Sequence, residues 1–231
     1  MLDELIKELK KYARSQDVEQ LGRFFKTGKG EYGEGDSFIG VRVPDMRTVA
    51  KGFMDMSYEY LQKLLQDKVH EYRQIALIIL VNKFKKVGEE EQKKIFDFYL
   101  KHTKFINNWD LVDLSAPTIV GGYLLDKKRD ILYKLAKSRN LWEKRIAIIA
   151  TAAFIAKKQY KDTLKISEIL LKDNHDLIHK AVGWMLREVG KKDQKVLEGF
   201  LKKYHKQMPR TMLRYAIEKL DEKKRKFYMK K

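Results

Sequence analysis

The sequence contains no cysteine, only three prolines and no long uninterrupted run of apolar residues. Without cysteine, the chain cannot form disulfides, thiolate zinc sites or iron–sulfur clusters, and it has no cysteine nucleophile. A transmembrane helix would require about eighteen consecutive apolar residues, and none occur, so we expect no membrane span. Residues 1–13 mix charged and apolar side chains as an amphipathic helix does, which is unlike a signal peptide. These absences predict a cytoplasmic protein.

Positive charge dominates the composition. The chain has 50 Lys and Arg residues against 32 Asp and Glu, a formal net charge of +18 that is spread along its 231 residues. Such an excess favours binding to nucleic acid or to an anionic membrane surface. The chain has no lipidation signal and no obvious amphipathic membrane anchor, so nucleic acid is the expected partner. Hydrophobic residues make up 44% of the chain, which is enough for a folded core.

Apolar residues recur with the period of an α-helix almost throughout, which predicts an all-α fold. The predicted helices cover residues 2–13, 16–26, 44–55, 57–66, 69–84, 87–102, 109–123, 127–137, 141–157, 161–172, 176–189, 193–206, 209–219 and a last short segment. Pro44 and Pro209 stand where the first turn of a helix tolerates proline. Pro117 lies inside the helix predicted to begin near Trp109, and it removes the amide that would bond the carbonyl of Asp113. We therefore expect a kink just beyond Asp113.

The helical pattern repeats along the chain. Similar segments begin at Gln74, Asp110, Arg145 and Lys180, and successive starts lie 35 or 36 residues apart. This period is typical of an array of helical hairpins, an α-solenoid in which each hairpin packs only against its neighbours. No linker rich in proline or glycine divides the chain, so we predict a single helical-repeat domain over residues 1–231.

Equivalent positions in stacked repeats line up along one concave surface. The residues at these positions and directly before them include Gln74, Trp109, Asp110, Lys144, Arg145, His179 and Lys180. Hairpins that only stack on one another do not need so polar or so charged a surface. We therefore predict a superhelix with a concave basic surface that binds a polyanion.

One glycine-rich segment suggests a nucleotide site, but its context argues against that function. The segment from Gly28 to Gly33 matches the glycine pattern of dinucleotide-binding proteins. That pattern requires a strand before it and a helix directly after it, whereas residues 21–26 have a helical pattern. Glu31 and Glu34 would also repel a pyrophosphate. We interpret the segment as a flexible loop between helices.

Two histidines have the spacing of metal ligands on a helix, His175 and His179. The central glutamate of the metalloprotease motif is missing, and only Asp173 and Asp176 lie near enough in sequence to serve as further ligands. Asp173 and its neighbour Asn174 have the residue types of helix caps. We predict no metal site here, and we expect His179 to face the polyanion or solvent.

The most informative pattern is Trp109 with Asp113, an indole and a carboxylate four residues apart on one helix face. A second helix face carries Lys180, Trp184 and Arg187 at similar spacing. Taken singly, a tryptophan is usually structural and a helical aspartate is usually solvated or paired. A carboxylate has little use in a simple phosphate clamp, because it repels phosphate. We therefore interpret the two faces together as a site for chemistry on a polyanion.

Four segments resemble a known family: Phe38–Pro44, Asn107–Gly121, Leu141–Arg145 and Ala181–Glu188. They are similar to segments of the AlkD-like DNA alkylation repair enzymes, the alkylpurine DNA glycosylases built from HEAT-like repeats. The resemblance runs from about residue 20 to about residue 220. It implies a HEAT-like superhelix and the removal of positively charged N3- or N7-alkylated purines, such as 3-methyladenine and 7-methylguanine, from duplex DNA during base excision repair.

The resemblance also implies roles for individual residues. It makes Asp113 the catalytic carboxylate, and it places Trp109 and Trp184 beside the sugar-phosphate of the lesion. Arg145 and Arg187 are implied to hold phosphates.

The repeat positions add further expectations. Lys180 and Lys144 join the expected DNA-binding residues because of their places in the repeats. Phe24 stands where many relatives have a tyrosine, so a hydroxyl contact there would be absent. No lysine has a context that singles it out as a Schiff-base nucleophile, so we expect a monofunctional glycosylase.

The expected partner is duplex DNA with alkylated bases, bound by a monomer that needs no cofactor, no metal and no obligate protein partner. Two other functions remain compatible with the sequence. The first is a non-catalytic protein that binds DNA structures on the same fold and would lose nothing if Asp113 were changed. The second is a helical-repeat scaffold for acidic protein partners, whose binding DNA would not compete. The presence of Asp113 with both tryptophans favours the enzyme.

Overall fold

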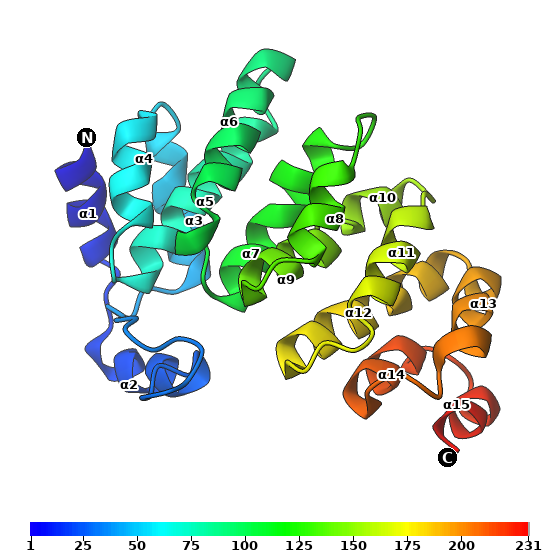
Figure 1. The fold of residues 1–231 in the computed structure, drawn as a ribbon. Coiled ribbons are helices and arrows are strands. Elements are labelled where there is room, and N and C mark those ends of the chain that lie inside the picture. The colour runs from blue at the N-terminus through cyan, green and yellow to red at the C-terminus, as the bar shows by residue number, and fades with distance from the viewer. Residues whose placement is uncertain (231) are drawn as a thin grey trace. The chain divides into compact units, whose positions relative to one another are not determined.

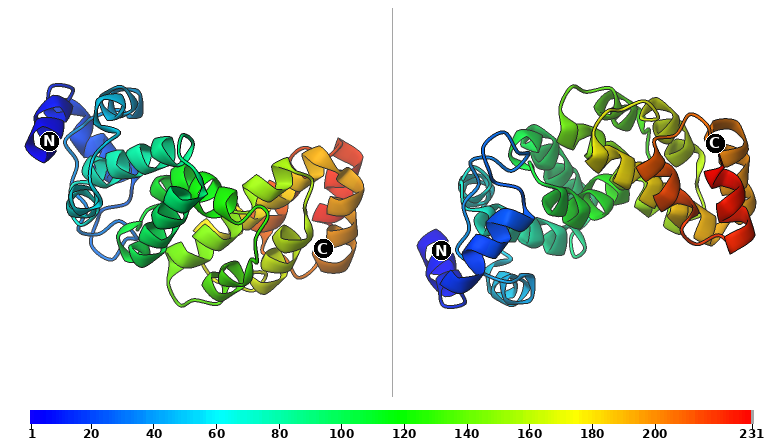
Figure 2. Two further views of the ribbon diagram at one scale, coloured as in Figure 1. Left: turned by 90° about the horizontal axis from the view of Figure 1, so that it is seen from above. Right: turned by 90° about the horizontal axis from the view of Figure 1, so that it is seen from below.

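The computed structural model describes residues 1–230, and these residues fold into helices joined by loops and turns (Figure 1, Figure 2). Outside the helices, the described residues contain one isolated parallel bridge, between Ser37 and Val69. None of the helices in residues 1–230 combines the length and the apolar character needed to cross a membrane. The all-α prediction is confirmed.

The chain divides into two compact units, Met1–Ser115 and Ala116–Lys231. The helices of the first unit are α1 (Leu2–Lys10), α2 (Ser15–Phe24), α3 (Val43–Ala50), α4 (Tyr58–Leu65), α5 (His70–Phe84), α6 (Glu89–Lys101) and α7 (Trp109–Ala116), whose last residue begins the second unit. The second unit contains α8 (Asp130–Ala136), α9 (Leu141–Ile149), α10 (Ala152–Ala156), α11 (Lys161–Ile169), α12 (Asp176–Lys192), α13 (Gln194–Tyr204), α14 (Arg210–Ile217) and α15 (Glu222–Met229). The single domain over residues 1–231 stays a prediction.

The predicted helices correspond to observed helices, with differences near their ends. The predicted helix 141–157 is divided into α9 and α10 by a turn at Ala150 and Thr151. At this turn the Thr151 hydroxyl donates to the carbonyl of Ile148 at 2.6 Å, a local side-chain bond that competes with a regular helix. The periodicity did not predict this interruption, because the apolar pattern continues across it.

Pro44 lies in the first turn of α3, as predicted. Pro117 follows α7 directly and begins a π-helical stretch, Pro117–Gly121. A proline removes one amide from the hydrogen-bond ladder, and a wider helical turn is one way in which a helix accommodates that loss. The expected irregularity just beyond Asp113 is therefore present as a π-helical turn.

Side-chain hydrogen bonds link residues that are about one repeat apart. Gln74 donates to Asp110, 36 residues later, at 2.8 Å. In the second unit Arg129 donates to Asp162, 33 residues later, and Arg145 donates to the carbonyl of Leu177, 32 residues later. Neighbouring hairpins are thus connected at positions that recur with the sequence period, as in a helical-repeat protein.

The most deeply buried helix of the first unit is α5, which packs against α3, α4 and α6. Its apolar run Ile75–Val81 is buried throughout. Four polar residues in its first turns are also buried, namely His70, Glu71, Arg73 and Gln74. Burying charged groups costs free energy unless they are paired, so these side chains require partners from other elements. Those partners form the candidate functional site.

Two glycines in the second unit test how closely its helices pack. A Cβ atom on Gly183 in α12 would lie 2.5 Å from the Met212 carbonyl and from the Tyr215 side chain, whereas one on Gly199 in α13 would meet nothing within 4 Å. We expect Gly183→Ala to lower the free energy of unfolding by about 1–3 kcal/mol through overpacking. Gly199→Ala should raise it by about 0.5–1 kcal/mol through helix propensity. Denaturant unfolding of both variants measures this, and equal effects would contradict the close approach at Gly183.

Candidate functional site

The helix α7 begins at the residues that the sequence singled out. The Asn108 side-chain oxygen accepts the Trp109 amide at 2.8 Å just before the helix, and Asn108 is fully buried. The first turn then presents Trp109 and Asp110, and Asp113 follows one turn later on the face of Trp109. Trp109 and Asp113 are half-buried, and the Asp110 side chain is only 10% exposed. An acidic residue in the first turn also suits the positive end of the helix dipole.

Trp109 packs into a cluster of aromatic rings from two other parts of the chain. Its ring stacks on Phe25 with 5.4 Å between centroids and an interplanar angle of 23°, and Phe24 meets it edge-on at 5.7 Å. Phe25 in turn stacks on Phe38 at 5.3 Å. The local sequence pattern does not predict this cluster, because its phenylalanines come from the end of α2 and from the irregular segment before α3.

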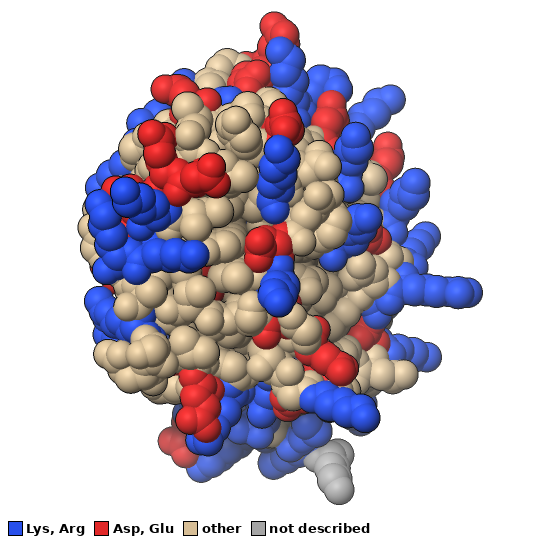
Figure 3. Space-filling model, turned by 90° about the vertical axis from the view of Figure 1, so that its left-hand side faces the viewer, with Lys and Arg blue, Asp and Glu red and all other residues tan. Residues whose placement is uncertain are grey.

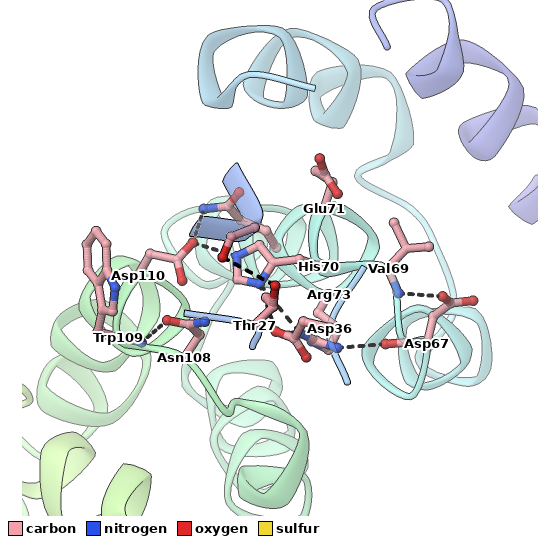
Figure 4. Close-up of polar contacts among 12 residues, drawn as sticks. Thr27, Asp36, Asp67, Val69, His70, Glu71, Arg73, Asn108, Trp109 and Asp110 are labelled. Atoms are coloured by element: carbon pink, nitrogen blue, oxygen red, sulfur yellow. Dashed lines mark hydrogen bonds and ion pairs between the residues drawn. The ribbon is translucent and has the colours of Figure 1, made fainter. Parts of the chain in front are cut away.

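Asp110 joins α7 to the buried polar turn of α5 (Figure 4). Its Oδ2 atom accepts hydrogen bonds from His70 Nε2 and from Gln74 Nε2, both at 2.8 Å. The other ring nitrogen of His70 faces Asp36 at 3.3 Å, and Arg73 forms an ion pair with the same Asp36 carboxylate. The side chains of His70 and Asp36 are only 1% and 3% exposed. The network therefore balances two cations against two carboxylates away from solvent.

Electrostatics hold His70 in its charged form. Burial alone lowers the pKa of the imidazole, but the charge and hydrogen bond of Asp110, together with the hydrogen bond of Asp36, raise it to about 9. Burial likewise acts to raise the pKa of Asp36, but the hydrogen bond from His70 and the charge of Arg73 lower it overall. At neutral pH His70 is thus an imidazolium that donates from both ring nitrogens.

Glu71 fixes the segment that carries Phe38. Its carboxylate is 1% exposed and accepts the amides of Ile39, Gly40 and Val41, with the shortest contact at 2.8 Å to Gly40. Gly40 has φ +81°, and a Cβ atom there would lie 2.1 Å from the carbonyl of Arg14. This position therefore requires glycine both for its backbone conformation and for the close approach of another chain segment.

These elements enclose a cavity of about 710 Å³ within the first unit. Its lining includes Phe24, Phe25, Phe38, Trp109 and Asp110. It is mostly apolar, with a few polar groups from the buried network.

Asp113 lies one turn further along α7 and is half-buried. Burial and the nearby Asp113 charge both raise the pKa of Tyr99, whose hydroxyl bonds Ser115 at 2.9 Å. The second predicted tryptophan, Trp184, is half-buried in α12 beside the closely packed Gly183. It belongs to the second unit, so its position relative to Asp113 stays a prediction.

The four cations expected to bind DNA all lie in the second unit, and all have partners within it. Lys144 pairs with Asp173, and Lys180 pairs with Asp176 at 2.7 Å. Arg187 pairs with Glu218 and with Glu188.

Arg145 differs from the other three cations because it is only 5% exposed, and it donates to the carbonyl of Leu177 at 2.7 Å. The sequence could not indicate these partners, since several come from the next repeat. On the face shown in Figure 3, lysine and arginine side chains are interspersed with carboxylates. The concave basic surface and the DNA-binding roles stay predictions.

The structure gives local roles to the two motifs that were set aside. In the glycine-rich loop the Glu31 carboxylate accepts the Gly28 amide at 2.9 Å, and Glu34 accepts the Gly30 amide at 2.8 Å. Amides that would contact a phosphate are thus occupied by carboxylates, and the loop follows helix α2 as predicted.

In the histidine pair, His175 accepts the Leu177 amide at 3.1 Å as the N-terminal cap of α12. Burial lowers the pKa of His175 although the charge of Asp173 acts to raise it, and a lowered pKa suits an accepting ring nitrogen. His179 contacts the carbonyl of Asp173 at 2.5 Å and is half-buried.

The raised pKa of His70 predicts how stability depends on pH. Between pH 6.5, the ordinary value for histidine, and about 9, the folded protein keeps a proton that the unfolded chain releases. The stabilisation is therefore complete below pH 6.5 and is lost as the pH rises through about 9. We expect the free energy of unfolding to fall by roughly 3 kcal/mol across this window.

Denaturant unfolding at several pH values tests this, together with NMR titration of the His70 ring in the wild-type protein. His70→Gln should remove most of the slope. His102→Gln is the control, because it also removes a buried imidazole, but one that bonds the Phe98 carbonyl instead of a carboxylate. A His70 ring that titrates near pH 6.5 would contradict the charged network.

Comparison with known proteins agrees with the resemblance seen in the sequence. The profile of the DNA alkylation repair enzyme family matches residues 5–220. A predicted DNA alkylation repair enzyme from Enterococcus faecalis has a similar structure, with a TM-score of 0.69, 17% sequence identity, and coverage of 91% of this chain and 97% of that one. AlkD2 from Streptococcus mutans is also similar, with a TM-score of 0.58, 18% identity, and coverage of 89% and 98%. At these identities the two structures show a shared fold. No curated protein matches the sequence.

Proposed function

The chain belongs to the DNA alkylation repair enzyme family, and we propose that within this family it is a monofunctional DNA glycosylase. The proposed substrates are positively charged N3- or N7-alkylated purines in duplex DNA, such as 3-methyladenine and 7-methylguanine. The observation that carries the proposal is the pair formed by Trp109 and Asp113 on one face of α7, at the end of a helix that a buried ion pair holds in place.

The chemistry of the lesion explains why such a pair suffices. An N-alkylated purine with a formal positive charge is already a good leaving group. Breaking its glycosidic bond builds positive charge on the deoxyribose. The Asp113 carboxylate stabilises that charge and orients the attacking water. The aromatic faces of Trp109 and Trp184 favour cationic character, by about 0.5–2 kcal/mol each when partly desolvated. No step of this scheme requires a metal or a redox cofactor.

In this proposal, cations of the second unit bind the phosphates of the DNA backbone. Lys180 and Arg187 would exchange a carboxylate partner for a phosphate. For Lys180, whose pair with Asp176 is exposed, such an exchange costs little, because solvent-exposed ion pairs contribute only about 0–1 kcal/mol. Phosphate contacts position the duplex and carry no sequence information, so damage recognition falls to the tryptophans and to Asp113.

Asp113→Asn tests the catalytic role. We expect the rate of 7-methylguanine release from a duplex with one such lesion, without added metal, to fall roughly 10- to 100-fold, as for the loss of one electrostatic stabiliser. Binding to undamaged duplex should hold or tighten slightly, because a charge that repels phosphate is gone. Asp97→Asn on α6, which removes an exposed carboxylate that pairs with Lys93, is the control and should release base at the wild-type rate.

The outcomes separate the candidate functions. Wild-type protein that binds duplex DNA but releases no base above the spontaneous rate would be a non-catalytic DNA-structure binder. Unchanged release by Asp113→Asn would make Asp113 structural. Failure of DNA to bind at all would favour the scaffold for acidic proteins.

Arg187→Ala tests how the DNA is bound. If Arg187 neutralises a phosphate, the slope of log affinity against log salt should become shallower by about one unit, and binding should weaken alike on different sequences. Arg187→Lys keeps the charge and should keep the slope. A salt titration of the three proteins on one undamaged duplex measures this. If wild type and Arg187→Ala have the same slope, then Arg187 only pairs with Glu218 and Glu188.

A further inference from the structure

The first turns of α7 carry two residues of the proposed glycosylase reaction. Trp109 begins the helix, and Asp113 follows four residues later on the same face. Between them stands Asp110, to which the proposed reaction gives no role. The Asp110 side chain is only 10% exposed, whereas Trp109 and Asp113 are half-buried. Asp110 is therefore a charged group of this helix that points into the first unit.

Two kinds of contact hold the start of α7. Leu111 and Val112 are fully buried, so apolar packing keeps the helix against the core. Such packing is non-directional and does not by itself fix the rotation of the helix about its axis. The Asp110 Oδ2 atom accepts hydrogen bonds from His70 Nε2 and Gln74 Nε2, both at 2.8 Å. Because hydrogen bonds are directional, these two donors from α5 fix the rotation of α7.

The donors of these hydrogen bonds are themselves held in place (Figure 4). The His70 side chain is 1% exposed, and its other ring nitrogen faces Asp36 at 3.3 Å. Arg73 forms an ion pair with the same Asp36 carboxylate and donates to the carbonyl of Asp67 at 3.0 Å. Asp110 is thus bonded to groups that are fixed from their far side, so the start of α7 has one favoured placement against α5.

The same turn of α5 also supports the rings on which Trp109 packs. The Glu71 carboxylate accepts backbone amides of residues 39–41, directly after Phe38. Phe38 stacks on Phe25 with 5.3 Å between centroids, and Phe25 stacks on Trp109 at 5.4 Å. A shift of α7 relative to α5 would therefore move the indole both from its helix position and from its stacking partner.

We propose that Asp110, held by His70 and Gln74, is a positioning residue for base excision. It sets the first turn of α7 so that the Trp109 indole and the Asp113 carboxylate act on the lesion together. The inference rests on the proposed function for the reaction that it serves. A misplacement of about 1 Å can lower a rate roughly 100-fold, so a residue that does not touch the DNA can still control the rate.

Asp110→Asn tests this role, because it removes the charge and keeps the size of the side chain. The single-turnover rate of 7-methylguanine release at saturating protein should fall about tenfold, as for a small misplacement of reacting groups. The affinity for the damaged duplex should change less than about twofold, since Asp110 does not contact the DNA.

Asp162→Asn is the matched control. Asp162 is also a buried carboxylate that accepts from two side chains, Arg129 at 2.7 Å and Tyr133 at 2.6 Å, but it lies on α11 in the second unit. Both substitutions should lower the free energy of unfolding, because each leaves buried donors without a charged acceptor. Base release is therefore measured where denaturation curves show every variant to be folded. Asp162→Asn should then release base at the wild-type rate.

The Trp109 indole gives a readout that does not depend on base release. The charged groups that face His70 are Asp36 from the segment before α3, Arg73 from its own helix and Asp110 from α7. The pKa of His70 is raised to about 9, first by the charge of Asp110. NMR signals of the carbon-bound ring protons of Trp109 should therefore move as the pH is raised through about 9 and the ring loses its proton.

The two variants should differ in this titration. In Asp110→Asn the burial of His70 is no longer offset by the Asp110 charge, so the Trp109 signals should move at a lower pH than in the wild type. In Asp162→Asn they should move at the wild-type pH. Comparison with Trp109→Phe assigns the signals. Trp109 signals that do not respond to pH in this range, or that respond alike in wild type and Asp110→Asn, would overturn the proposal.

The base-release assay separates this inference from the proposed function. Equal rates for wild type and Asp110→Asn would overturn the positioning role alone, and so would equal losses in Asp110→Asn and Asp162→Asn, since lowered stability would then account for both. A wild-type protein that releases no base would overturn the proposed function. The NMR titration would in that case still show whether Asp110 fixes the Trp109 ring.

Discussion

The ion pair between His70 and Asp110 is the contact on which the candidate site depends. It joins the buried helix α5 to the first turn of α7, where Trp109 begins the helix and Asp113 follows one turn later. Removing charges from water costs several kcal/mol per ion unless each is paired and hydrogen-bonded. Here Asp110 receives two donors, and His70 faces a carboxylate on each side. The start of α7 is fixed because any other placement would leave a buried charge without its partner.

The same ion pair lies between two parts of the first unit, a buried pair of charged side chains and a cavity with aromatic walls. On one side of His70 are Asp36 and Arg73, whose side chains are buried and paired with each other. On the other side are the aromatic rings and the cavity. A chain with a large positive charge attracts DNA as a whole, but a cationic lesion has to be stabilised locally by negative or aromatic groups. The first unit supplies such groups from residues that are otherwise structural, and the second unit contains the expected phosphate-binding cations.

The sequence predicted the helices well because a 3.6-residue apolar period is a local property of the chain. It also predicted that Gln74 and Asp110 occupy equivalent places in successive repeats, and the structure joins them by a hydrogen bond. It did not predict the part played by His70. Nothing near His70 in the sequence indicates that two carboxylates, 34 residues before it and 40 residues after it, converge on its ring.

The sequence did not predict the ion pairs of the cations in the second unit for the same reason. Lys144 and Arg187 were expected to bind DNA, and the structure places Asp173 beside the first and Glu218 beside the second. Each partner lies about thirty residues away, so only the stacking of one hairpin on the next creates the pair.

The sequence by itself determined the helical class, the repeat, the positions of Trp109 and Asp113 on one helix face, and the likeness to alkylation repair enzymes, because these depend on local order and residue type. Only the tertiary structure decided which charges are buried, which are paired, and where aromatic rings from α2 and α7 meet around a cavity. Those features depend on the free energy of burying groups that are far apart in the sequence. No local sequence pattern indicates that free energy.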